Sequence, residues 1–279
     1  MLDVGEWTGH VGDVWAEEWR RTDRSLADLG THLNAAILAA LPDGRGTVAD
    51  IGCGAGATTI AVATARSDIG VVGFDLSSAL VAIARERTVT LPDVSFASGP
   101  VEREISSFAG FDLVMSRHGV MFFENPVDAI GRIRAATKRG GTLIFSCFRE
   151  VARNAWASEM IAAIDGTSPF FGDGYVPGPF AFADPDFVSA TLQAAGWTDV
   201  NMRSVPFIYR AGAGADPIDD AVYFLCRIGP GARALRSADP DERPRIVKAI
   251  RDVCARHLLG NAVDFSATAW IWTARNRCV

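Results

Sequence analysis

The sequence has few cysteines and histidines, and neither set forms a recognisable framework. The five cysteines include no C-x-x-C pair, and the four histidines lie far apart along the chain. We therefore expect neither a disulfide-stabilised domain nor a bound metal. Reduced thiols are typical of the cytoplasm, which is where we expect this chain to act.

Long apolar runs and clusters of positive charge are also missing. The longest apolar stretch, residues 35–41, is far too short to span a bilayer, and the first residues lack the regions of a signal peptide. The net charge is −6, and no Lys/Arg cluster stands out. We expect neither a membrane nor an extended nucleic-acid partner. The sequence does not indicate which oligomeric state the chain adopts.

What the sequence does contain is an alternation of short apolar strands and helices. Strands are expected at 47–51, 71–74, 94–97, 111–115 and 142–148, with helices at 57–66, 79–88 and from 125 onward. This spacing predicts an α/β fold with a Rossmann-like, doubly wound, mostly parallel sheet of seven strands. Long strands at 197–210 and 264–274 flank a helical stretch, so we expect an antiparallel last strand and helical cap insertions.

The most informative stretch is the turn after the first strand. Gly52, Gly54 and Gly56 alternate there, and a helix follows. Glycines permit positive φ and close approach to a ligand, while the helix N-terminus presents unpaired N–H groups. Asp75 ends the second strand, where a carboxylate can accept hydrogen bonds from both hydroxyls of a ribose. Together, these features predict a site for an adenosine-containing cofactor.

Two cofactor classes fit this turn. The spacing Gly52-x-Gly54-x-x-Ala57 also matches the looser nicotinamide-dinucleotide fingerprint, and would indicate an NAD(P)-dependent oxidoreductase. S-adenosylmethionine is favoured because Asp50 is placed to meet the cationic end of a methionine. Some 45 residues also precede the first strand, and no Tyr-x-x-x-Lys pair is present.

Residues 48–148 resemble the class I S-adenosylmethionine-dependent methyltransferases. The matching stretches, in the family's order, are Val48–Gly56, Val72–Ser77, Phe111–Arg117 and Gly140–Leu143. The likeness is greatest to the bacterial small-molecule methyltransferases, which residues 7–9, 23–26 and 116–123 also resemble. The resemblance implies in-line transfer of a methyl group from S-adenosylmethionine to a small-molecule acceptor.

The resemblance also implies which residues bind the cofactor. The residues expected around its methionine part are Asp50 and the backbone of Gly52, Cys53, Gly54 and Gly56. Asp75 is expected to hold the ribose hydroxyls, with Leu76 and Val101 against the adenine. Ser116 is expected near the methionine amino group, with Arg117 beside it. Cys53 is expected to fill space rather than to act as a nucleophile.

Two positions depart from the family pattern. Pro100 stands where the family often has an acid that binds the adenine amino group, so adenine recognition is expected to depend on backbone groups or on Glu102. This departure keeps open a non-catalytic S-adenosylmethionine-binding member of the fold. Arg139 replaces the usual proline before two glycines, which we interpret as a turn variant.

Three segments follow from these assignments. Residues 1–45 are expected to form an N-terminal helical cap segment, and residues 46–148 the cofactor-binding Rossmann-like core. Residues 149–279 are expected to complete the sheet and to carry acceptor-site insertions at about 149–183 and 211–262. We expect the three segments to form one compact domain.

The acceptor side is less determined. His118 follows the fourth strand and is the one candidate base, since its ordinary pKa of about 6.5 lies near working pH. The alternative is a cleft histidine that only packs or donates a structural hydrogen bond. Arg117 is expected either to contact an anion or to pair internally. Aromatic residues suggest a pocket for a planar apolar acceptor or a cationic amine, or else packing of the cap. The candidates are Trp15, Trp19, Phe170, Phe171, Tyr175, Tyr209 and Tyr223.

Overall fold

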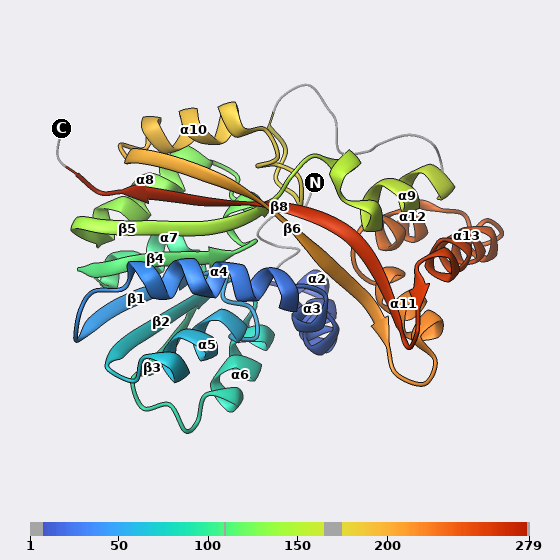
Figure 1. The fold of residues 1–279 in the computed structure, drawn as a ribbon, viewed down its shortest axis with the longest axis horizontal. Helices are drawn as coiled ribbons and strands as arrows, with labels where there is room; N and C mark the ends of the chain where they lie inside the picture. The colour runs from blue at the N-terminus through green and yellow to red at the C-terminus, as the bar shows by residue number, and fades with distance from the viewer. Residues whose placement is uncertain (1–7, 109, 165–174, 278–279) are drawn as a thin grey trace.

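The structure, a computed structural model, describes residues 8–108, 110–164 and 175–277. These residues form one sheet of eight strands in the order β3-β2-β1-β4-β5-β8-β6, and a short β7 pairs with β8 (Figure 1). The strands are β1 Gly46–Ile51, β2 Ile69–Asp75, β3 Val94–Ser98, β4 Phe111–Arg117, β5 Thr137–Phe148, β6 Thr198–Ala213, β7 Leu258–Leu259 and β8 Ala262–Arg275.

Strand direction follows the sequence pattern. The first five strands run parallel, and β8 runs antiparallel to both β5 and β6. The predicted α/β fold and antiparallel last strand are thus confirmed. The difference is β7, which forms because the chain reverses at Gly260, where φ is +61°, and pairs Leu259 with Ala262.

Helices cover both faces of the sheet. They are α2 His10–Glu17, α3 Trp19–Ser25, α4 Ala27–Ala40, α5 Ala57–Ala65, α6 Ser78–Arg87, α7 Val101–Glu104, α8 Pro126–Ala136, α9 Ala155–Ile164, α10 Pro185–Ala194, α11 Pro217–Leu225, α12 Pro230–Ser237 and α13 Arg243–Arg256. Helices α4 and α5 contact each other and the sheet, and α8 and α10 form a second pair. None of the helices among the described residues is long and apolar enough to cross a bilayer.

Local signals explain where several helices begin. Asn125 accepts a hydrogen bond from the N–H of Asp128, and Pro126 fills the first helical position of α8, where its missing N–H costs nothing. Ser77 caps α6 in the same way by accepting from the N–H of Leu80. The starts of α6 and α8 lie within one residue of the positions expected from the sequence.

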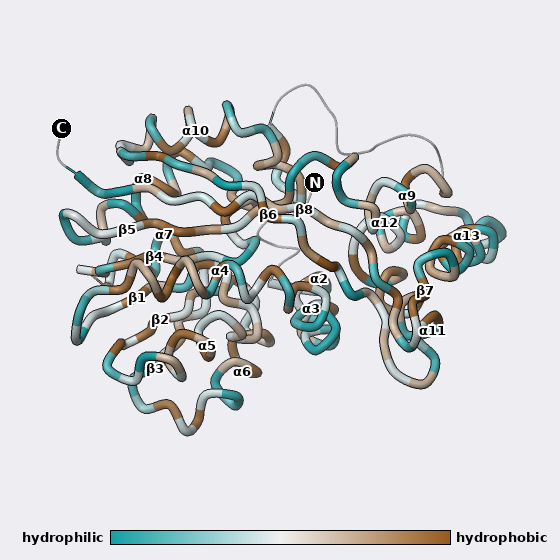
Figure 2. Tube along the Cα trace, in the orientation of Figure 1, coloured by the Kyte–Doolittle hydropathy of each residue, from teal (hydrophilic) through white to brown (hydrophobic). Residues whose placement is uncertain are grey.

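The core is concentrated in the central strands. Leu113, Val114 and Met115 of β4 are buried on both faces of the sheet, as expected for parallel strands between helix layers. Figure 2 shows the opposite character in α13, which is hydrophilic along much of its outer surface. Strands β6 and β8 extend beyond this core and carry α11, α12 and α13 as a cap that also contacts α9 (Figure 1).

Candidate functional site

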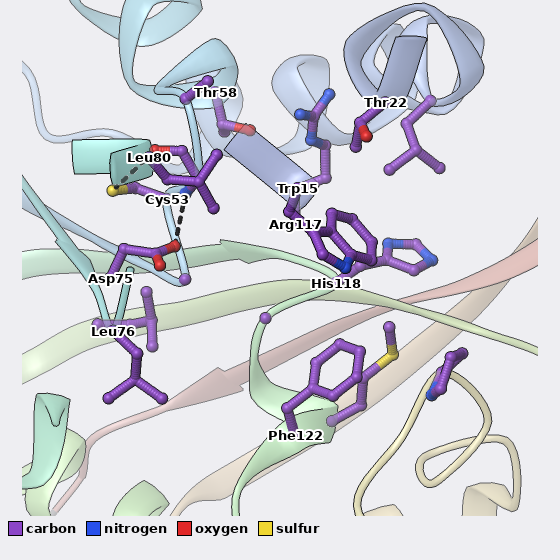
Figure 3. Close-up of a pocket in the computed structure, with 18 of the residues that line it drawn as sticks. Trp15, Thr22, Cys53, Thr58, Asp75, Leu76, Leu80, Arg117, His118 and Phe122 are labelled. Atoms are coloured by element: carbon purple, nitrogen blue, oxygen red, sulfur yellow. Dashed lines mark hydrogen bonds between the residues drawn. The ribbon is translucent and has the colours of Figure 1, made fainter. Parts of the chain in front are cut away.

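A pocket lies at the carboxyl ends of the parallel strands, where ligands bind in open α/β sheets, and continues between the sheet and the cap. Its first part is lined by the turn after β1, the ends of β2 and β4, and residues 99–102. Its second part is lined by Met121, Phe148, Trp156, Tyr209, Phe224 and Ile228, which we call the aromatic chamber. Figure 3 shows Asp75 and Leu76 on one side of the first part and Arg117 with Trp15 on the other.

The turn after β1 needs its glycines for different reasons. Gly52 and Gly54 have φ of +64° and +54°, a region that other residues rarely adopt. A Cβ on Gly52 would lie 2.8 Å from the Cα of Gly119, whereas a Cβ on Gly54 would meet no described atom within 4 Å. Gly52 therefore permits a close contact between two chain segments, and Gly54 leaves space toward the pocket.

Two neighbours of these glycines do not present a reactive group to the pocket. Gly56 caps α5 with φ of +82°, and a Cβ there would lie 3.3 Å from the Cβ of Ala84. It faces α6 and is not in the pocket lining formed by the described residues, contrary to expectation. Cys53 does line the pocket, but burial, followed by the charges of Asp75 and Asp50, raises the pKa of its thiol. Its expected space-filling role agrees with this environment.

Asp75 is held at the end of β2 by backbone groups. One carboxylate oxygen accepts a hydrogen bond of 2.8 Å from the N–H of Gly54 (Figure 3). The other accepts one of 2.9 Å from the N–H of Ser77. Burial raises the pKa of Asp75, and these two hydrogen bonds oppose the rise. Each oxygen keeps a second lone pair, so the fixed carboxylate can still accept hydrogen bonds from ribose hydroxyls.

Asp50 is a buried carboxylate with unused bonding capacity. Oδ2 accepts a hydrogen bond of 2.7 Å from the hydroxyl of Thr59, whereas Oδ1 is buried without a partner among the described residues. Burial raises the pKa of Asp50 to about 7, and the Thr59 hydrogen bond and the charge of Arg117 oppose the rise. An unpaired buried carboxylate oxygen that lines a pocket suits a cationic ligand group such as an ammonium.

The far end of the first part suits an apolar ring. Leu76 and Val101, the two residues expected against the adenine, both line it, together with Pro100 and Glu102. Val101 is the first residue of α7 and is buried, whereas Glu102 is half-buried. The positions that the sequence assigns to adenine therefore lie in one place.

Ser116 differs from its expected role. Its fully buried hydroxyl donates to the carbonyl of Ile51 over 2.7 Å and accepts from the N–H of Gly119 over 3.1 Å. It is not in the lining that the described residues give the pocket. Ser116 instead fixes the segment that approaches Gly52, because both bonding directions of its hydroxyl are used inside the protein.

Arg117 lines the pocket and is paired internally. Its Nη2 lies 2.8 Å from Oδ1 of Asp23 in α3, and Nη1 of Arg87 lies 2.9 Å from the other oxygen of Asp23. The Arg87 guanidinium also lies over the ring of Trp19, 4.1 Å from its centroid. Of the two interpretations of Arg117, the structure shows the internal ion pair, and contact with an anion stays a prediction. Sequence reasoning did not identify Asp23 and Arg87 as its partners, because no local pattern links residues so far apart.

His118 lies at the junction of the two parts. Its Nδ1 is 2.9 Å from the hydroxyl of Ser146, and its ring packs edge-on against Phe148 at 4.1 Å between centroids. Its Nε2 is buried and has no partner among the described residues. Burial, and then the charge of Arg117, lowers the pKa of His118 to about 3, so the ring is neutral near pH 7. Its φ of +61° is rare for a residue with a side chain.

The aromatic candidates divide into two groups. Trp15, Trp19 and Tyr209 line the pocket. Tyr175 instead donates its hydroxyl to the carbonyl of Phe123, and Tyr223 lies half-exposed beneath two arginines. Phe170 and Phe171 lie outside the described residues. Sequence reasoning missed Phe148, Trp156 and Phe224, whose apolar surroundings in the sequence resemble ordinary core segments.

Part of the chain is similar to known proteins. Residues 49–145 match the family model described as a methyltransferase domain. The chain is 27% identical over 104 residues to malonyl-[acyl-carrier protein] O-methyltransferase of Halalkalibacterium halodurans, which covers 36% of this chain and 38% of that protein. It is 26% identical over 168 residues to demethylmenaquinone methyltransferase of Paenarthrobacter aurescens, covering 57% and 64%. The matches thus span less than two thirds of these relatives.

Solved structures share the fold over more of the chain. The YcgJ protein of Bacillus subtilis has a TM-score of 0.56 at 16% identity, covering 88% of this chain and 98% of that one. The phosphoethanolamine N-methyltransferase 2 of Haemonchus contortus has a TM-score of 0.56 at 16% identity, covering 100% and 61%. The [4+2]-cyclase SpnF has a TM-score of 0.54 at 21% identity, covering 89% and 82%. At these identities the likeness shows the fold alone.

Proposed function

We propose that this chain, whose residues 49–145 belong to a methyltransferase domain of the class I fold, transfers a methyl group from S-adenosylmethionine to a small-molecule acceptor. The observation that carries the proposal is the continuity of the pocket, in which the glycine turn and Asp75 share one space with the aromatic chamber. Such continuity allows a methyl donor and an acceptor to meet inside the protein. The products are the methylated acceptor, S-adenosylhomocysteine and a proton.

The first part of the pocket is proposed to hold the donor. Oδ1 of Asp50 is proposed to face the ammonium group, Asp75 the ribose hydroxyls, and Leu76 with Val101 the adenine. The backbone of Gly52, Cys53 and Gly54 encloses the methionine part. When bound, S-adenosylmethionine supplies an electrophilic methyl group on a sulfonium. Asp50 supports this assignment because its unpaired oxygen gains a partner of opposite charge.

The chain's own contribution to the reaction is alignment and exclusion of water. Enclosing both reactants in one orientation can lower the barrier by roughly 7–11 kcal/mol in favourable models. The aromatic chamber removes water from the acceptor, and the pairing of Asp23 with Arg117 holds α3 beside the glycine turn. A role for His118 as base stays a prediction, and its low pKa favours contact through a neutral ring over proton uptake.

The remaining segments are proposed to serve the acceptor. Residues 1–45 contribute Trp15 and Trp19 to the pocket, and the two insertions contribute Trp156, Phe224 and Ile228. We also propose a cytoplasmic location, which is supported by the described cysteines, Cys53, Cys147, Cys226 and Cys254, all of which are free thiols.

The proposal is tested by comparing ligands that distinguish the cofactor classes. Thermal unfolding should shift upward with S-adenosylmethionine and S-adenosylhomocysteine and remain unchanged with NAD. Incubation with methyl-labelled S-adenosylmethionine and a panel of aromatic alcohols, amines and acids should then transfer label to an acceptor. A shift with NAD alone would support the oxidoreductase alternative. Retained cofactor with no label transfer to any acceptor would support the non-catalytic alternative.

A further inference from the structure

The aromatic chamber combines apolar walls with buried donors that lack partners. Trp156 is 3% exposed and His118 is 7% exposed, and both line the pocket. Nε1 of Trp156 and Nε2 of His118 have no hydrogen-bond partner among the described residues. A buried polar group without a partner is costly, so two in one chamber point to a ligand that supplies the missing bonds.

The hydrogen-bond partners of His118 determine what its Nε2 offers. The fully buried hydroxyl of Ser146 needs an acceptor for its proton, and Nδ1 of His118 is the partner that lies 2.9 Å away. A Ser146 hydroxyl that donates to Nδ1 leaves the proton of the neutral ring on Nε2. The indole Nε1 of Trp156 is also a donor only. Both groups therefore call for an acceptor atom on the ligand.

The charges around the pocket argue against a charged acceptor. Arg117 and Asp23 neutralise each other, Asp50, Asp75 and Glu102 belong to the first part, and Glu124 is exposed. The chamber as the described residues form it contains no ionised side chain, so a charge placed there would lack a partner.

The walls of the chamber include aromatic rings that pack against one another. Trp156 lies parallel to Tyr209, 4.9 Å between centroids, and to Phe180 at 5.8 Å, while Phe148 lies 5.1 Å from Trp156. Aromatic walls of this kind favour flat aromatic ligands, which gain from offset or edge-on contacts. Tyr209 is buried, which raises the pKa of its hydroxyl, and a hydrogen bond with Ser25 opposes the rise.

We propose that the methyl acceptor is an uncharged aromatic ring bearing a hydroxyl or carbonyl oxygen, which accepts hydrogen bonds from Nε2 of His118 and Nε1 of Trp156. This inference rests on the proposed function and narrows it. It decides between the two acceptor classes that the sequence leaves open, in favour of the planar apolar molecule over the cationic amine.

The test uses ring probes of one shape that differ in polarity and charge. Naphthalene, 1-naphthol, 1-naphthoate and 1-naphthylmethylammonium are titrated by calorimetry into the full chain saturated with S-adenosylhomocysteine. We expect 1-naphthol to bind about tenfold tighter than naphthalene, which corresponds to one or two net hydrogen bonds, and tighter than either ion. Binding of the ammonium probe as tight as that of 1-naphthol would overturn the inference, as would failure of every probe to bind.

Variants separate the donors from the packing. Trp156→Phe keeps an aromatic ring without the N–H and should reduce the preference for 1-naphthol over naphthalene by about fivefold or more. Trp272→Phe is the matched control, because Trp272 is equally buried but lies outside the pocket lining of the described residues. It should leave the preference unchanged, and equal effects of the two variants would contradict the proposed contact.

Ser146→Ala supplies an independent test of the His118 donor. Without the hydroxyl, the ring proton is free to move from Nε2 to Nδ1. The preference for 1-naphthol over naphthalene should therefore fall, while the affinity for naphthalene stays the same. An unchanged preference would refute this contact. Binding of S-adenosylhomocysteine is measured first in each variant. Its absence in the wild-type chain would refute the proposed function, whereas its presence with the wrong probe order would refute only the acceptor class.

Discussion

Arg117 at the end of β4 and Asp23 in α3 form an ion pair of 2.8 Å that joins the N-terminal helices to the carboxyl edge of the sheet. Asp23 also pairs with Arg87 of α6, so one carboxylate links three elements around the glycine turn. Both arginines are largely buried beneath this contact, at 14% and 24% exposure. The pair therefore holds one wall of the proposed cofactor site in place.

Asp23→Asn should loosen this wall. Loss of the carboxylate removes two charge-assisted hydrogen bonds, so we expect the dissociation constant of S-adenosylhomocysteine to rise by roughly 5–30-fold. Calorimetry measures the change. Asp13→Asn in the neighbouring helix α2 is the control, since Asp13 is exposed, and it should leave affinity unchanged. Equal affinities of wild type and Asp23→Asn would show that the wall forms without the pair.

Asp75→Ala should nearly abolish cofactor binding. The substitution removes the proposed ribose contacts and also the bonds that hold Gly54 and Ser77, so affinity for S-adenosylhomocysteine should fall by about 100-fold or more. Asp93→Ala, at an exposed carboxylate before β3, should have no such effect. Retention of wild-type affinity by Asp75→Ala would refute the ribose assignment.

Two glycine substitutions should have different consequences. Gly52→Ala places a Cβ 2.8 Å from the Cα of Gly119, so the backbone must shift and stability should fall by more than about 2 kcal/mol. Gly54→Ala should lower stability by only about 1–2 kcal/mol, because the new side chain meets no described neighbour and only the left-handed φ is unfavourable. The substitution also adds a methyl group toward the pocket.

Urea unfolding and calorimetry together check this difference. Gly52→Ala should be the less stable variant, and Gly54→Ala should stay folded while it loses affinity for S-adenosylhomocysteine. The account of the turn fails if the order of stability is reversed, or if Gly54→Ala binds as tightly as wild type.

The raised pKa of Asp50 predicts how the stability of the unliganded chain depends on pH. Its pKa rises from 3.8 to about 7 on folding, so between these values the folded state retains a proton that the unfolded state has lost. The contribution of Asp50 is therefore absent below about pH 4 and becomes increasingly unfavourable as pH rises toward 7. Asp50→Asn should raise the melting temperature relative to wild type at pH 8 and change it little at pH 4.5.

The same substitution should weaken cofactor binding, because the amide cannot neutralise an ammonium group. Melting curves with and without S-adenosylhomocysteine measure both effects in one experiment. We expect the unliganded variant to melt at a higher temperature than wild type and S-adenosylhomocysteine to raise its melting temperature by less. This result would indicate that the Asp50 carboxylate serves ligand binding at a cost in stability. A variant that is less stable than wild type at pH 8 would contradict the origin assigned to the pKa shift.

The sequence predicts the cofactor half of this protein well because its signals are local. Alternating strands and helices predicted a mostly parallel sheet with an antiparallel last strand, as observed, and the turn at Gly52 with Asp75 predicted a cofactor site at the edge where the pocket lies. Residues 49–145 match a methyltransferase-domain model, in agreement with the predicted family and with S-adenosylmethionine as its cofactor. Turn chemistry is encoded within a few residues, so a single chain suffices to recognise it.

The sequence predicts less where the geometry depends on distant segments. The Ser116 hydroxyl points into the protein because Gly119 packs on Gly52. Asp23 forms its ion pair with Arg117, which is distant in the sequence. Trp156 belongs to a helix whose apolar residues are indistinguishable from core in the sequence. The position of Trp156 depends on how β6 and β8 hold the cap against α9, and no local sequence pattern predicts that arrangement.

The most direct test of the central claim is a calorimetric titration of the wild-type chain with S-adenosylhomocysteine near pH 7.5. The account predicts one site per chain, with a dissociation constant below about 0.1 mM. The absence of heat or of any thermal stabilisation at millimolar ligand would contradict it.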